Sequence, residues 1–198
     1  MYMQDFGISN TMKNQYSNYS DAELGEMLTG KKEVAERAFA ELYSRYSRKV
    51  YAYCLKILGN KEDAGDVFQD TFVRFYNSAS QRVINGNIGG YIITISRNLC
   101  LNYKRDRKPM ESFEEYMGSP QNELLEEQDS KEQLELIQSA LNKLPIEYRD
   151  AFVLRQYQGY SYQEISDMTG ESSSTVKNRV WRAKEKIKSL LAPYLKDY

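Results

Sequence analysis

The sequence contains no histidine among its 198 residues, and it has only two cysteines, one tryptophan and four prolines. Without histidine, the chain lacks the commonest general acid or base and the commonest nitrogen ligand for metals. It also has no glycine-rich phosphate loop, no serine nucleophile elbow and no paired-cysteine metal spacing. We therefore expect a protein that is not an enzyme and that holds no metal ion and no cofactor.

Long apolar runs are missing as well. The mean hydropathy is -0.70, and no segment approaches the ~20 apolar residues that a membrane-spanning helix needs. Residues 1–19 are polar and lack the basic start and apolar stretch of a secretory signal. We expect no membrane insertion, a cytoplasmic location and a flexible extension over residues 1–19.

The two cysteines, Cys54 and Cys100, each lie in an apolar, helix-like stretch. Lone cysteines in such surroundings are more often buried thiols than partners in a disulfide or a redox pair. We expect two buried free thiols.

The net charge of -1 hides a strong segregation of charge along the chain. Residues 97–108 carry a net charge of +4, residues 110–135 carry -8, and residues 174–188 carry +5. Two basic patches separated by an acidic connector are typical of a chain that contacts nucleic acid at two places.

Apolar residues recur at helical spacing through nearly the whole chain, which predicts an all-α fold with two small helical domains. The first domain covers residues 20–108 and has four helices, with an exposed loop at 78–90. Pro109 and Pro120 bracket an acidic linker at 109–130, which the sequence predicts to be partly disordered. The second domain covers residues 131–198.

The segment 160–188 has the pattern of a helix-turn-helix. Ser161 and Glu164 form a capping box, Gly170 is suited to end the first helix, and serines 172–174 offer caps for the second. In that second helix, apolar residues at spacings of three and four share one face: Val176, Val180, Ala183 and Ile187. The cationic remainder fits a DNA major groove; the alternative is a surface hairpin with a solvated basic face.

These segments resemble the bacterial RNA polymerase sigma factors of the sigma-70 family, in particular the extracytoplasmic-function group. In the first domain the resemblance rests on DAGDVFQDTF at 63–72 and on YIITISRNL at 91–99 with the basic run after it. In the second it rests on Leu144, Pro145 and Arg149, on YSYQEI at 160–165 and on STVKNRVWRAK at 174–184. Two positions depart from the family pattern: Tyr91 stands where tryptophan is usual, and Gly65 where glutamate is usual.

The resemblance implies a dissociable sigma factor that binds core RNA polymerase, recognises the promoter -10 and -35 elements and promotes DNA opening. It further implies an anti-sigma factor as a partner. The polymerase-binding residues that it implies are Asp66, Gln69, Asp70 and Arg74. For the -10 element it implies Asn85, Asn87, Tyr91, Arg97, Asn98, Asn102, Lys104 and Arg105. For the -35 element it implies Ser174, Thr175, Lys177, Asn178, Arg179, Trp181 and Arg182.

Two other functions stay open at this point. A free-standing repressor or activator, with a first domain for dimerisation or ligand sensing, explains the helix-turn-helix but not the second basic patch. An adaptor related to anti-sigma regulation explains the acidic linker but not two cationic helices. For Trp181 the alternative to DNA contact is a core aromatic at the domain edge.

Overall fold

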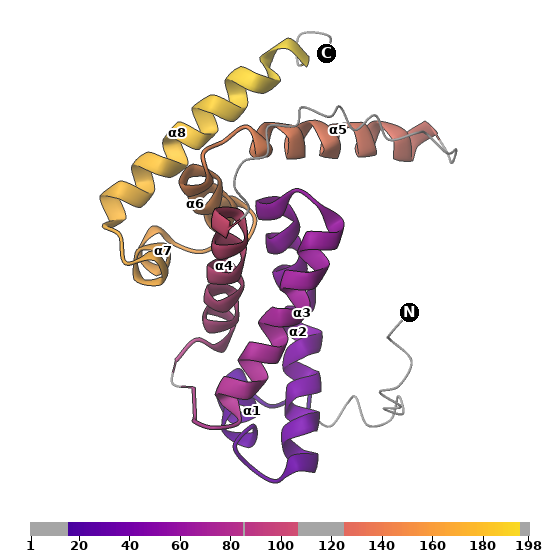
Figure 1. Ribbon diagram of the computed structural model, residues 1–198, viewed down its shortest axis with the longest axis vertical. Coiled ribbons are helices and arrows are strands. Elements are labelled where there is room, and N and C mark those ends of the chain that lie inside the picture. The colour runs from indigo at the N-terminus through magenta and orange to yellow at the C-terminus, as the bar shows by residue number, and fades with distance from the viewer. Residues whose placement is uncertain (1–15, 85, 107–124, 195–198) are drawn as a thin grey trace.

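The computed structural model describes residues 16–84, 86–106 and 125–194, without the side chains of residues 125–132. In these ranges the chain forms eight α-helices, one short 3-10 helix and no strand, so the all-α prediction is confirmed. Helices α1 to α4 make one body, and α5 to α8 lie across its upper end and along one side (Figure 1).

The first body consists of α1 (Asp21–Met27), α2 (Lys32–Leu58), α3 (Lys61–Ala79) and α4 (Ile88–Asp106). Polar side chains cap the starts of α1 and α3. Ser20 and Glu23 form a capping box, and the Asn60 side chain accepts hydrogen bonds from the backbone N–H groups of Glu62 and Asp63. Gly59 ends α2 in the left-handed conformation at φ 78°, which a residue without Cβ adopts readily.

Aromatic rings from α2 and α3 pack against the aliphatic core of this body. The Tyr43 and Phe72 rings lie 4.7 Å apart between α2 and α3, and the Phe39 and Tyr76 rings lie 5.1 Å apart. Tyr53, on the same stripe of α2, is fully buried. Cys54 and Cys100 are buried free thiols, as expected, and the Cys54 Sγ lies 3.1 Å from the Ser96 Oγ.

The predicted loop at 78–90 is longer than the real connection, because α3 continues to Ala79 and α4 begins at Ile88. Gly89 and Gly90 are therefore helical, against the prediction. A Cβ on Gly89 would lie 2.5 Å from the Tyr46 Cε1, so tertiary packing needs a glycine there and overrides its poor helix propensity. Asn87 supports the start of α4 by accepting a hydrogen bond from the Gly90 N–H at 2.9 Å.

The second body consists of α5 (Leu125–Asn142), α6 (Ile146–Gln156), α7 (Tyr162–Thr169) and α8 (Ser173–Leu191), followed by the 3-10 helix η1 (Ala192–Tyr194). The last six residues of the predicted acidic linker, 125–130, belong to α5, and residues 109–124 of that linker lie outside the described residues. The core of the second body is aliphatic, with Leu141, Leu154 and Ile165 fully buried. Helices α5 and α6 both contact α2, so the two bodies pack against each other.

Candidate nucleic-acid interface

Helices α7 and α8 form the predicted helix-turn-helix. The Ser161 Oγ accepts from the Glu164 N–H, and the Glu164 carboxylate accepts from the Ser161 N–H, so the capping box is present. Gly170 ends α7 at φ 71°, and Ser172 caps α8 by accepting from the Thr175 N–H. These local signals explain why the chain turns sharply here and presents α8 as a separate, projecting helix.

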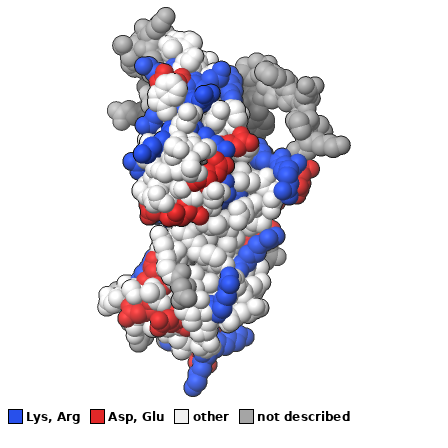
Figure 2. Space-filling model, turned by 90° about the vertical axis from the view of Figure 1, so that its left-hand side faces the viewer, with Lys and Arg blue, Asp and Glu red and all other residues white. Residues whose placement is uncertain are grey.

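One face of α8 is buried and the remaining sides are polar. Val176, Val180 and Ala183 are buried and Ile187 is half-buried, as the spacing predicts. Ser174, Lys177, Asn178, Trp181 and Arg182 are exposed on the other side. Figure 2 shows Lys and Arg side chains gathered over the upper part of this view, where α8 lies.

Trp181 is 61% exposed, so the alternative that it is a core aromatic is wrong. An exposed tryptophan beside cations is available for contact with sugars or a thymine methyl group. The neighbouring Arg182 Nε donates to the Asn178 Oδ1 at 2.8 Å, which holds the two side chains together on the exposed side.

Two of the predicted -35 residues, Arg179 and Thr175, contact the turn between α7 and α8. The Arg179 Nη2 forms an ion pair with the Glu171 Oε1 at 2.9 Å, and Arg179 is half-buried. The Thr175 hydroxyl lies 2.8 Å from the Ser172 hydroxyl. Both side chains therefore stabilise the turn in this conformation.

Arg155 of α6 adds a cation beside α8 that the sequence pattern does not indicate. The Arg155 guanidinium of α6 lies over the Tyr162 ring at 4.9 Å, and the Lys177 ammonium lies 5.7 Å from the same ring. Tyr162 thus gathers two positive charges at the edge of the helix-turn-helix. Only the contact across α6 and α7 reveals this grouping, because Arg155 is distant from the basic run in sequence.

Helix α4 carries the predicted -10 residues on two different faces. Positions 87, 91, 98, 102 and 105 follow one another at helical spacing and share one side of the helix. On this side Asn87, Asn98, Asn102 and Arg105 are exposed, and Asn85 lies outside the described residues. Arg97 and Lys104 are seven residues apart and occupy another side.

Tyr91 combines packing with a polar edge. Its ring centroid lies 6.3 Å from that of Phe75, and its hydroxyl lies 2.8 Å from the Ser78 Oγ. The hydrogen bond with Ser78 lowers the pKa of Tyr91. The aromatic residue in place of the family's tryptophan is thus half-buried and braces α4 against α3.

The predicted polymerase-binding residues lie together on α3. Asp66, Gln69, Asp70 and Arg74 are all exposed and recur at spacings of three and four, so they line one side of the helix. Gly65 stands next to them, and a Cβ there would have no heavy atom within 4 Å. The face is a continuous polar strip beside the exposed Val73, which is 57% exposed.

Arg97 is held by the second body. Its Nε donates to the Asp150 Oδ2 of α6 at 2.6 Å, and the Tyr53 hydroxyl of α2 donates to the Asp150 Oδ1 at 2.7 Å. Burial raises the pKa of Asp150, and the Arg97 charge opposes that shift. The family resemblance implies only a -10 role for Arg97, and no sequence pattern indicates its partner Asp150.

Other polar contacts join the same two bodies. The Arg149 Nη1 donates to the Ile57 carbonyl at 2.8 Å, while its Nη2 donates to the Asn142 carbonyl at 2.5 Å. Burial lowers the pKa of Arg149 to about 10. The Lys56 ammonium lies 3.8 Å from the centre of the Tyr157 ring. The contact surface between the bodies is therefore rich in charged groups.

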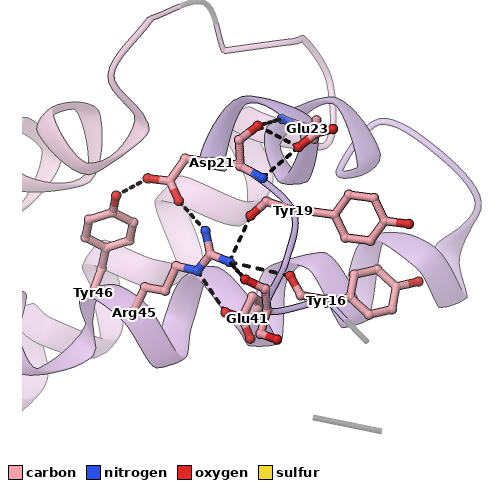
Figure 3. Close-up of polar contacts among 9 residues, drawn as sticks. Tyr16, Tyr19, Asp21, Glu23, Glu41, Arg45 and Tyr46 are labelled. Atoms are coloured by element: carbon pink, nitrogen blue, oxygen red, sulfur yellow. Dashed lines mark hydrogen bonds and ion pairs between the residues drawn. The ribbon is translucent and has the colours of Figure 1, made fainter. Parts of the chain in front are cut away.

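A further polar cluster positions α1 behind the start of α4. The Arg45 guanidinium donates to the Tyr19 carbonyl at 2.9 Å and forms ion pairs with Asp21 and Glu41 (Figure 3). The Tyr46 hydroxyl donates to the other Asp21 oxygen, and the Tyr46 ring packs on Gly89. This cluster fixes the end of α4 that carries Asn87 and Tyr91.

Comparison with known proteins assigns both bodies. Residues 42–109 match the family model described as sigma-70 region 2, and residues 134–187 match the one described as sigma-70, region 4. The ECF RNA polymerase sigma factor SigW of Bacillus subtilis is 30% identical over 78% of this chain and 89% of its own length. The chain belongs to the extracytoplasmic-function group of sigma factors.

One further relative and two solved structures are also similar to this chain. ECF RNA polymerase sigma factor SigE of Mycolicibacterium smegmatis is 33% identical, with the match covering 82% of this chain and 65% of that protein. A structure of CnrH in complex with the cytosolic domain of CnrY shares the fold, with a TM-score of 0.67, 23% identity and coverage of 87% and 97% of the two chains. RpoE of Bartonella quintana, solved with the anti-sigma factor NepR, has a TM-score of 0.62 at 24% identity and coverage of 78% and 96%.

As a sigma factor, the protein is a dissociable subunit of RNA polymerase that recognises promoters in transcription initiation, and it is not an enzyme. Among the described residues, no helix is long and apolar enough to cross a membrane.

Proposed function

We propose that this sigma factor divides its work among three helices. The polar strip of α3, formed by Asp66, Gln69, Asp70 and Arg74, docks on the coiled coil of the polymerase clamp. The exposed side of α4, with Arg97 and Lys104 from its neighbouring side, engages the -10 element. The exposed side of α8 enters the major groove at the -35 element.

The exposed side of α8 is the observation that carries the proposal. A helix anchored on one side by aliphatic residues and projecting after a tight glycine turn has the shape of a recognition helix. Arg182 and Lys177 are donors suited to guanine, and Asn178 is suited to adenine or a phosphate. Trp181 is exposed between them and is free to pack on sugar or a thymine methyl group.

The α4 surface has the chemistry expected of a strand-separating site. Melting requires a surface that holds single-stranded DNA better than duplex DNA, through aromatic stacking and cationic contacts to phosphates. Asn98, Asn102 and Arg105 offer amides and a cation along one exposed side, and Tyr91 lies half-buried on the same side, nearer the start of the helix.

Two solved structures of the same fold also suggest a further partner for this chain. Two solved relatives of the same fold are complexes with the cytosolic domain of CnrY and with the anti-sigma factor NepR. We propose an anti-sigma factor for this chain as well and, since core polymerase is its partner, a cytoplasmic site of action. If the protein were a dimeric repressor, the helix-turn-helix would have a function, but the α3 strip and the α4 surface would have none. We therefore prefer the sigma-factor assignment to the repressor alternative.

The test of the -35 assignment is promoter binding by the holoenzyme that carries Arg182→Ala. If Arg182 makes a bidentate base contact, the change costs ~1–3 kcal/mol and relaxes preference at one base pair. Lys188→Ala is the matched control, since Lys188 is an exposed cation later on the same helix. Equal losses on every -35 sequence would make Arg182 a phosphate contact, and no loss would remove it from the interface.

A further inference from the structure

The contact between the two bodies centres on one buried carboxylate. Asp150 of α6 has 3% of its side chain exposed, and both of its oxygens are taken by groups of the first body. Tyr53 donates to one oxygen at 2.7 Å and Arg97 donates to the other at 2.6 Å. The Arg97 side chain is 14% exposed, so a proposed DNA-binding cation is largely covered by the second body.

The same packing brings the two proposed DNA-binding surfaces together. A Cβ on Gly90, at the start of α4, would lie 3.3 Å from the Met168 Cε in α7 of the helix-turn-helix. Helices α6 and α8 are also in extensive contact, so α8 is tied to the helix that carries Asp150. The -10 and -35 surfaces therefore belong to adjoining elements.

Promoter DNA requires a far larger separation. Elements named for positions 10 and 35 base pairs upstream lie about 25 base pairs apart, or about 85 Å of B-form duplex at about 3.4 Å for each base pair. Helices α4 and α8 have 19 residues each and are about 28 Å long. The packed arrangement cannot place both surfaces on the two elements at once.

We propose that Asp150 is an interdomain latch that holds the free sigma factor closed by occupying Arg97 and Tyr53. The inference rests on the proposed assignment of the -10 and -35 elements. Docking on polymerase and promoter separates the bodies, so that Asp150 becomes hydrated and Arg97 is released toward DNA phosphates. In the closed state, the Asp150 carboxylate thus occupies the position next to Arg97 that a DNA phosphate takes in the open state.

Asp150 is suited to this role because its partners come from the other body. A carboxylate paired within one body would stabilise that body alone and would not respond to separation. Removal of one member of a buried ion pair leaves the other charge without compensation, which disfavours the closed state strongly. In the open state both groups reach water, so the same substitution has little effect there.

The test measures the separation of the bodies in the full-length free chain. Spin labels at Asn77→Cys in α3 and Lys188→Cys in α8 report it by double electron–electron resonance, since both positions are exposed and Cys54 and Cys100 are buried. Asp150→Asn keeps the size and shape of the side chain. The amide has one acceptor oxygen in place of two, so it cannot accept from both the Tyr53 hydroxyl and the Arg97 Nε as the carboxylate does. We expect the closed-to-open ratio to fall by about 100-fold or more.

Two further variants make the result decisive. Glu147→Gln makes the same carboxylate-to-amide change at an exposed position of α6. Its distance distribution should be the same as that of the parent chain. Tyr53→Phe removes only the hydroxyl and should shift the distribution in the same direction as Asp150→Asn, by a smaller factor. If both Asp150→Asn and Tyr53→Phe keep the short distance while the circular dichroism spectrum stays native, the latch is overturned.

A second measurement separates this proposal from the assignment of promoter elements. The rate of holoenzyme assembly with core polymerase should rise in Asp150→Asn, because the opening step is removed. If distance and assembly rate both change but base substitutions at -10 and -35 have no effect on the holoenzyme, the latch stands and the element assignment fails. If Asp150→Asn opens the chain but leaves the assembly rate unchanged, the latch does not limit polymerase binding, and that part of the proposal is contradicted.

Discussion

The first body buries three aromatic side chains, Tyr53, Phe72 and Phe75, whereas every apolar side chain buried in the described part of the second body is aliphatic or alanine. The second body also buries two charged residues, Arg149 and Asp150, and the first body buries only the neutral polar residues Thr71 and Ser96 in the described ranges. Both charged residues make hydrogen bonds to the first body. The difference indicates a self-sufficient first body and a second body that depends partly on polar contact with it.

That contrast matches the demands on the two bodies. The α3 strip and the α4 surface must hold a fixed geometry to bind polymerase and to separate strands, and large rings within an aliphatic core add buried area that favours rigidity. The second body must move relative to the first to span a promoter. Hydrated ion pairs replace buried ones at little net cost, so a charged contact is easier to open than an apolar one of the same area.

The largest expected effect comes from removing a ring in the first body. Phe72→Ala deletes a side chain that is 4% exposed and packs against Phe39, Tyr43 and Phe68, so unfolding should become easier by ~3–5 kcal/mol. Chemical denaturation measures the loss. The adjacent Val73→Ala, at a 57% exposed position, is the control and should change stability by ~0.5 kcal/mol or less.

An intermediate effect is expected at the buried arginine of the second body. Arg149→Met leaves the carbonyls of Ile57, Asn142 and Leu144 without this donor and should cost ~2–4 kcal/mol. Hydrogen exchange should locate the loss in α5 to α7 and leave the amides of α3 protected. Equal loss of protection in α3 would break the comparison, because the first body would then depend on the second.

The smallest effect is expected at the capping box of α7. Ser161→Ala removes the acceptor for the Glu164 N–H and should cost ~1 kcal/mol. Ser20→Ala makes the same change in the capping box of α1. Thermal unfolding of the two variants compares caps of identical design in the two bodies, and the α7 variant alone should also weaken -35 binding by the holoenzyme.

Much of this architecture is predictable from the sequence because local signals specify it. Apolar spacing and capping residues correctly predict the helix-turn-helix of α7 and α8 and the turn at Gly170. The start of α4 is missed because Gly89 is helical only through its contact with Tyr46, which lies far away in the sequence. The Asp150–Arg97 pair is missed for the same reason, since 53 residues separate its members and nothing local marks Asp150 as buried.

The roles given to individual residues come from the family resemblance, and the structure adds where each residue lies. The spacing of Asp66, Gln69, Asp70 and Arg74 indicates a shared face, and the structure confirms their exposure. Exposure is also what a solvated surface shows, so the partner of that face comes from family membership. For Arg97 the structure adds a partner, Asp150 of α6, which the sequence pattern of α4 does not indicate.

The central claim, that one polymerase subunit uses two separate bodies on two promoter elements, is tested most directly by run-off transcription with core enzyme on a library of upstream regions. We predict transcripts that need the chain and core together, and that fall when bases change either near -10 or near -35. Asp66→Arg and Asp70→Arg should lower transcription by weakening the polymerase contact, whereas Glu26→Arg, at an exposed acid of α1, should not. Tight binding of the chain alone to operator DNA as a dimer, with no transcript added by core enzyme, would contradict the account.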